Sequence, residues 1–146
     1  MRASSQSTTR ERLKAGGVWA DGADSLLVMD APRPGDRISV LRMHWLSLVL
    51  SGAKTLEIRG RNLSAGFYWL GTRGMIHGRA NLAGGTRITT ARAWQDLRPL
   101  HCVDSDELPY KRTYGLLIRS CERVGPIPYT PKRGAIGIVK YTPTVP

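Results

Sequence analysis

The amino-acid sequence predicts an α+β fold, in which a small β-barrel of about five to six strands carries two or three short helices. The apolar runs are short, and most alternate with polar residues as half-buried strands do. Helix-type spacing of apolar residues occurs in few places, and strands and helices do not alternate as they do in βαβ units. The small residues Gly78 and Ala80 stand at inward positions of one expected strand, where a narrow barrel leaves little room for side chains.

Expected elements in the first part of the domain begin with a short, partly β-branched strand over residues 38–43. Apolar residues then recur at helical spacing over residues 44–51, and Gly52 stands where a helix end needs a left-handed residue. Alternation over residues 54–59 predicts a half-buried strand with polar side chains on its outer face. The next two strands are expected over residues 67–70 and 75–83.

The second part of the domain contains one further expected helix and two strands. Thr89 or Thr90 can cap the helix, which continues to Leu97. Residues 101–110 indicate an irregular loop with at most one helical turn. The last strands are expected over residues 114–124 and 135–141, and a stiff, basic, proline-rich loop over residues 125–134 separates them.

The 146 residues are enough for one domain, which we place at residues 37–146. Residues 1–17 are rich in Ser, Thr and Arg and contain too few apolar groups to offset the entropy of ordering. Residues 25–29 contain the only apolar cluster before the domain and are a candidate short strand or docking segment. Residues 31–35 contain Pro and Gly in a pattern typical of a linker. We therefore expect a flexible N-terminal extension over residues 1–36.

The charge of the chain favours a polyanionic partner. There are 22 Lys and Arg against 11 Asp and Glu, a net charge of +11, and the first 36 residues contain equal numbers of both signs. The whole excess therefore belongs to the expected domain, and most of it is Arg. Basic residues on expected exterior faces or loops, with rings among them that could stack on bases, are Arg59, Arg61, Arg73, Arg79, Arg87, Lys132 and Arg133, with Tyr68, Trp69 and Tyr129. Ordinary scattered surface arginines are the alternative explanation.

Several classes of protein are disfavoured. No apolar run approaches the roughly 18 residues that span a bilayer, and no secretory signal is recognisable. We therefore expect no membrane association and a cytoplasmic location. An organelle transit peptide in the first sixteen residues is the alternative. Cys102 and Cys121 form no CxxC pair and are expected to be reduced thiols. His77, His101 and Cys102 lack the spacing of zinc ligands, and no nucleotide-binding glycine motif is present. We expect no metal and no cofactor, and we favour a monomer.

A short motif follows the first expected helix. Gly52, Lys54, Glu57 and Arg59 form the pattern G-x-K-x-x-E-x-R, after a strand and a short helix that contains Trp. This arrangement resembles the ASCH domain, a branch of the PUA-like barrel superfamily, and residues 127–136 are similar to the closing loop and strand of that family. The resemblance covers roughly residues 37–141. It implies a PUA-like barrel with a pocket between barrel and helices, proposed to bind RNA or modified nucleosides.

Lys54 and Glu57 are the candidate catalytic residues. A lysine beside a carboxylate can orient a phosphate or a carbonyl, and a glutamate can accept a hydrogen bond from a base amino group. An ordinary surface ion pair of Glu57 with Arg59 or Lys54 is the plainer explanation. Trp45 and Trp94 lie on apolar helix faces, where core packing is expected more often than base stacking. The candidate ligand- or RNA-binding residues are His44, Trp45, Lys54, Glu57, Arg59, Arg61, Arg79, Tyr129, Lys132 and Arg133.

The expected function is recognition of RNA, single-stranded or structured, or of a nucleotide, in a basic cleft whose rim is the loop at residues 129–133. A hydrolase acting in the same cleft is the alternative. The resemblance includes small bacterial amidohydrolases that act on acetylated cytidine, but their nucleophilic Thr is replaced here by Glu57, and Thr55 is the nearest hydroxyl. It also includes proposed ribonucleases, for which Glu57 and Lys54 would supply a base and a cation. A protein-interaction module with a basic face is the third class.

Overall fold

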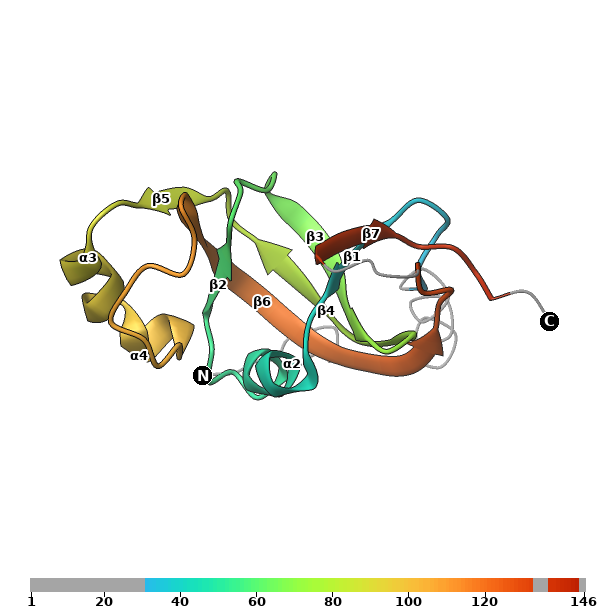
Figure 1. Ribbon diagram of the computed structural model, residues 1–146. Coiled ribbons are helices and arrows are strands. Elements are labelled where there is room, and N and C mark those ends of the chain that lie inside the picture. The colour runs from blue at the N-terminus through green and yellow to red at the C-terminus, as the bar shows by residue number, and fades with distance from the viewer. Residues whose placement is uncertain (1–30, 133–136, 145–146) are drawn as a thin grey trace. The chain divides into compact units, whose positions relative to one another are not determined.

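The computed structural model describes residues 31–132 and 137–144 (Figure 1). The chain divides into two units, Met1–Pro32 and Arg33–Pro146, and every helix and strand given below lies in the second unit. Of the extension expected at residues 1–36, residues 1–30 lie outside the described residues, and residues 31–36 contain no helix or strand, as expected for a linker.

Seven strands form one curled sheet, in the order β2-β6-β4-β3-β1-β7 with the short β5 paired to β6 (Figure 1). Neighbouring strands are antiparallel, except that β1 and β3 are parallel. The two ends of this order, β2 and β7, are not paired with each other within the described residues. We call the line between them the seam. The strands are β1 (Arg37–Val40), β2 (Leu56–Arg59), β3 (Gly66–Thr72), β4 (Met75–Leu82), β5 (Thr86–Ile88), β6 (Thr113–Pro128) and β7 (Gly137–Lys140).

Three short helices are described: α2 (Met43–Leu50), α3 (Ala91–Asp96) and α4 (Arg98–His101). Helix α2 ends as expected, because Gly52 adopts the left-handed conformation with φ +84°. The Thr90 side chain accepts a hydrogen bond from the Ala93 backbone N–H and so caps α3. No described helix is both long and apolar enough to span a bilayer.

The core lies on the inner face of the sheet, beneath α2. Along β4 every second residue is buried, from Ile76 to Leu82, as its alternating pattern predicts. Leu46 and Val49 of α2 pack against this face in one cluster of buried side chains. A second cluster contains Ile38, Trp69, Ile76 and Tyr129. Gly78 permits the close approach of α2, since a Cβ at that position would lie 2.5 Å from Leu50 Cδ2.

The α+β fold with a small PUA-like barrel is confirmed, although the sheet contains seven strands where five to six were expected. The three residues of β5 and the single turn of α4 were not expected, because elements this short leave little periodic signal. The proline-rich loop expected from residue 125 is shorter, since β6 continues to Pro128.

Three aromatic rings that were candidates for stacking on bases are buried, although for Trp69 a core position was considered as well. Tyr68, Trp69 and Tyr129 belong to the core, and Tyr129 is only 2% exposed. The ring of Tyr129 packs over Gly71, where a Cβ would lie 3.0 Å from Tyr129 Cε1. Tyr129 therefore cannot act as the exposed rim of a cleft. Its basic neighbours in the sequence suggested a surface position, but its ring packs in the core.

Candidate functional site

Lys54 is held between the end of α2 and α4. Its backbone N–H donates to the Leu48 carbonyl oxygen at 3.0 Å, and the N–H of Thr55 donates to the Leu100 carbonyl oxygen at 3.0 Å. The side chain is only 3% exposed. Its Nζ donates to the His101 carbonyl oxygen at 2.5 Å and lies 4.9 Å from the centre of the Trp45 ring. The lysine therefore points inward.

Glu57 and Arg59 extend from β2 toward the seam. Glu57 is 6% exposed, and its Oε2 lies 2.9 Å from Arg59 Nε. The Arg59 guanidinium also donates to the hydroxyl oxygen of Ser39, in β1. A Cβ at Gly137, the first residue of β7, would lie 3.8 Å from Arg59 Nη1. Arg59 therefore crosses the seam from one edge of the sheet to the other.

Lys54, Glu57 and Arg59 together form what we call the seam cluster. Burial raises the pKa of Glu57, and the nearby positive charges of Arg59 and Lys54 oppose that rise. Burial also lowers the pKa of Lys54, and the charge of Glu57 opposes this change. Each group is thus closer to its neutral form than it would be in water. With all three groups ionised, two cations surround one carboxylate, which leaves one excess positive charge in a desolvated place.

His101 contacts the cluster through its backbone carbonyl oxygen, which accepts the hydrogen bond from Lys54. Its ring stacks on Trp94 with 3.8 Å between ring centres, and its Nε2 lies 2.8 Å from the Trp94 carbonyl oxygen. The Val103 N–H donates to Nδ1 at 2.9 Å, so Nε2 carries the ring proton. Burial lowers the pKa of His101, which favours this neutral ring. The result is a fixed carbonyl oxygen that accepts the bond from Lys54.

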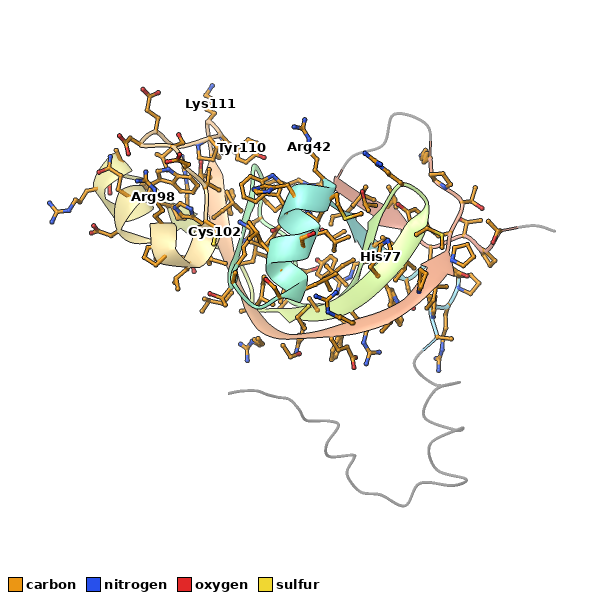
Figure 2. The ribbon with its side chains drawn as sticks, turned by 90° about the horizontal axis from the view of Figure 1, so that it is seen from below. Arg42, His77, Arg98, Cys102, Tyr110 and Lys111 are labelled. Carbon is orange, nitrogen blue, oxygen red and sulfur yellow. The ribbon has the colours of Figure 1, made fainter. Side chains whose placement is uncertain are left out.

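Partly exposed side chains border the cluster. Trp45 is half-buried, and the exposed His44 ring packs edge-on against it with 4.6 Å between ring centres. Cys102 lies between α4 and α2 (Figure 2), and its thiol donates to the Ala53 carbonyl oxygen at 3.3 Å. Trp45 packs less deeply than Trp94, which is completely buried as expected for a core residue.

The structure brings together only part of the predicted binding set. Arg61 and Lys132 are exposed, and Arg133 lies outside the described residues. Arg79 lies on the outer face of β4, where its Nη2 is 2.8 Å from Glu122 Oε1, and its guanidinium lies over Phe67. Arg79 therefore belongs to the outer face of β4, and Tyr129 to the core.

Two contributors were missed by the sequence analysis. Ser39 lies 20 residues from Arg59 in the sequence, and His101, whose carbonyl binds Lys54, lies 47 residues from it. Neither Ser39 nor His101 stands in a recognisable motif. Among the described residues, no group of three or more His, Cys, Asp or Glu is arranged to hold a metal ion. The seam cluster, with its two cations and single carboxylate, has the charge of a site for an anionic group.

Comparisons with known proteins identify the fold. No family model matches the chain, and no curated protein matches it. Among solved structures, ASCH from Zymomonas mobilis aligns with 16% identity and a TM-score of 0.60, over 74% of this chain and 88% of the other. Two single-residue variants of the Zymomonas mobilis ASCH protein align with 14% identity and TM-scores of 0.59, over 77% and 74% of this chain and 92% and 91% of theirs. Because three solved ASCH structures align with TM-scores of 0.59–0.60 over about three quarters of this chain, the chain has an ASCH-type fold.

Proposed function

We propose that the domain binds single-stranded RNA or a modified nucleoside at the seam cluster. The excess positive charge of that cluster carries the proposal. Taking ions out of water is costly, and a buried ion cluster adds little stability compared with apolar side chains. A phosphate or another anionic group beside Lys54 and Arg59 would balance the charge. Perturbed ionisable groups of this kind gather at functional sites more often than elsewhere.

The border of the cluster suits a nucleobase. The rings of His44 and Trp45 offer partly exposed aromatic surface beside Lys54, and aromatic rings stack on bases. The Glu57 carboxylate can accept a hydrogen bond from a base amino group such as that of cytosine. The net charge of +11 for the whole chain supports a polyanionic ligand over a neutral one.

Binding of labelled single-stranded RNA, duplex RNA, single-stranded DNA and acetylated cytidine tests the proposal. Lys54→Met keeps the apolar stem and removes the charge, and we expect it to weaken binding of the preferred ligand by about tenfold or more, as expected for a lost charge-assisted hydrogen bond. Lys140→Met removes the same charge from an exposed position in β7 and serves as the matched control. Equal loss in both variants, or loss in neither, contradicts the proposal, provided that thermal unfolding shows both variants folded.

A hydrolase acting at the same cluster is the second candidate, and the opposite pKa displacements of Lys54 and Glu57 favour it. Such displacements bring an acid and a base toward the neutral range, where general acid–base catalysis works best. With acetylated cytidine, Glu57 would take a proton from water, and the oxygen of that water would attack the acetyl carbon. The C–N bond would break as the proton passes to the amino nitrogen, which gives acetate and cytidine.

Product analysis separates the two candidates. Wild-type protein is incubated with acetylated cytidine or with RNA, and the products are resolved by chromatography. Glu57→Gln is expected to lose turnover by at least a hundredfold while it still binds, because an amide cannot take up the proton. Binding by the wild type without any product leaves recognition as the function and eliminates the hydrolase.

A further inference from the structure

We infer that Tyr110 is a stacking platform for a second base of single-stranded RNA, next to the seam cluster. This inference rests on the proposed function, because it concerns another part of the same ligand. The Tyr110 ring lies over Gly60, where a Cβ would be 3.1 Å from Cδ1 and 3.2 Å from Cγ. The residue is nevertheless 49% exposed. The ring is thus packed against the backbone on one side and open to solvent elsewhere.

The backbone at Tyr110 is fixed by a turn. The hydroxyl of the buried Thr113 donates to the Tyr110 carbonyl oxygen at 3.0 Å and accepts from the Tyr110 N–H at 3.3 Å. A platform that is already in place loses little conformational entropy when a base stacks on it. An exposed tyrosine held in this way is a better stacking partner than one that moves freely.

Cationic residues follow both Tyr110 and its contact residue Gly60 in the sequence. Arg61 follows Gly60, and Lys111 and Arg112 follow Tyr110; all three are exposed, and none has an acidic partner within the described part of the chain. Tyr110 and Lys111 project from the same side of the domain (Figure 2). The acidic residues of this region, Asp104, Asp106 and Glu107, precede the ring, and Asp106 is paired with Arg98 at 2.7 Å.

Cross-strand pairing adds one further cation, Arg87, on the same face of the sheet as Arg59 of the seam cluster. Arg59 of β2 and Arg87 of β5 are both register partners of Tyr114, on its two sides in β6. Directly paired residues in a sheet share a face, so Tyr114 and Arg87 lie on the same face of the sheet as Arg59. Arginines alternating with aromatic rings match the phosphates and bases of a single strand. A duplex, whose bases already stack on one another, lacks free base faces for Tyr110.

The distance from the cluster identifies the ligand as longer than one nucleotide. Gly60 lies three residues beyond Glu57 and six beyond Lys54, and a strand rises about 3.3 Å per residue. Gly60, beneath the platform, therefore lies about 10 Å along the chain from Glu57. When one nucleotide is bound at Lys54, the base that stacks on Tyr110 therefore belongs to a neighbouring nucleotide of the same strand.

Two ligands of different length test the inference, a mononucleotide and a single-stranded RNA hexamer. Tyr110→Ala is expected to weaken hexamer binding about 5- to 100-fold, as expected when one base loses its aromatic partner, and to leave mononucleotide binding unchanged. Tyr110→Phe keeps the ring and is expected to bind the hexamer within about twofold of the wild type. Phe67→Ala removes a 55% exposed ring from the outer face of the sheet and is the matched control, with no expected effect.

The outcomes separate this inference from the proposed function. Hexamer binding that Lys54→Met weakens and Tyr110→Ala does not would overturn the inference and leave the proposed function standing. A wild-type protein that binds neither ligand at low salt overturns both. Gly60→Ala provides a second variant, because its methyl group displaces the Tyr110 ring without deleting it. We expect it to weaken hexamer binding less than Tyr110→Ala does.

Discussion

At the scale of single residues, Glu57 is an acid placed where its charge is costly. Burial raises its pKa, and the cations of Arg59 and Lys54 compensate only in part. The folded protein therefore holds the Glu57 proton more tightly than the unfolded chain does. As the pH rises from about 4.5, the usual pKa, through the folded pKa, this group lowers the free energy of unfolding.

Glu57→Gln should remove that pH dependence. We expect the free energy of unfolding of the wild type, relative to that of the variant, to decrease as the pH rises above 4.5, because glutamine does not titrate. Urea unfolding at a series of pH values measures the difference. Glu107→Gln, at an exposed position, is the control. A difference between wild type and Glu57→Gln that stays constant with pH would show that Glu57 titrates as it does in water.

The residues of the cluster could be predicted, and their surroundings could not. Lys54, Glu57 and Arg59 stand in one short motif that the sequence displays. Their burial depends on Ser39 and His101, which the fold brings from other elements, and no local pattern encodes those contacts. The exposed Tyr110 was missed for a related reason, since its role depends on Gly60, a residue fifty positions earlier.

At the scale of elements, the contact of α2 with β4 depends on Gly78. A Cβ there would lie 2.5 Å from Leu50 Cδ2 and 2.9 Å from the Glu122 carbonyl oxygen. Because the second contact is with backbone, the structure can relieve it only by moving a strand. Helix α2 leads directly to Gly52 and Lys54, so a displaced helix would also displace the seam cluster.

Gly78→Ala is expected to lower the free energy of unfolding by about 1–3 kcal/mol, as overpacking of a core does. Gly84→Ala introduces the same methyl group where nothing lies within 4 Å, and we expect a change of less than about 1 kcal/mol there. Denaturant unfolding of both variants measures the contrast. Equal stabilities of the two variants would mean that α2 and β4 separate easily to admit the methyl group.

Elements with a strong repeating pattern were predictable. The alternation along β4, the cap at Thr90 and the turn at Gly52 follow from local chemistry. The end of β6 was not predictable, because Pro126 and Pro128 indicate a loop. Within the described residues that end of β6 pairs only with β4, so the absence of a proline N–H on its other side costs no strand pairing.

At the scale of the whole molecule, the charge excess predicts salt-dependent binding of RNA. For single strands the logarithm of the binding constant falls with the logarithm of salt concentration by about 0.7 for each phosphate neutralised. Lys111→Gln combined with Arg112→Gln should therefore reduce the slope by about 1.4. Arg92→Gln, at an exposed position in α3 beside Asp96, is the control and should leave the slope unchanged.

Hexamer binding measured over a range of salt concentrations checks this prediction. A double variant with the wild-type slope would place the phosphates elsewhere on the domain.

The fold class was predictable at this scale because short alternating strands without βαβ repetition leave few arrangements. The order of the strands was not, because it depends on pairings between distant parts of the chain.

The pairing of β7 with β1 also has a consequence for the newly made chain. Register partners such as Ile38 and Val139 are separated by about 100 residues. During synthesis on the ribosome, β1 can pair with β3 early, but it can pair with β7 only when nearly all of the domain has emerged. Until then, one edge of β1 presents unpaired backbone groups, the kind of edge at which nascent chains associate with one another.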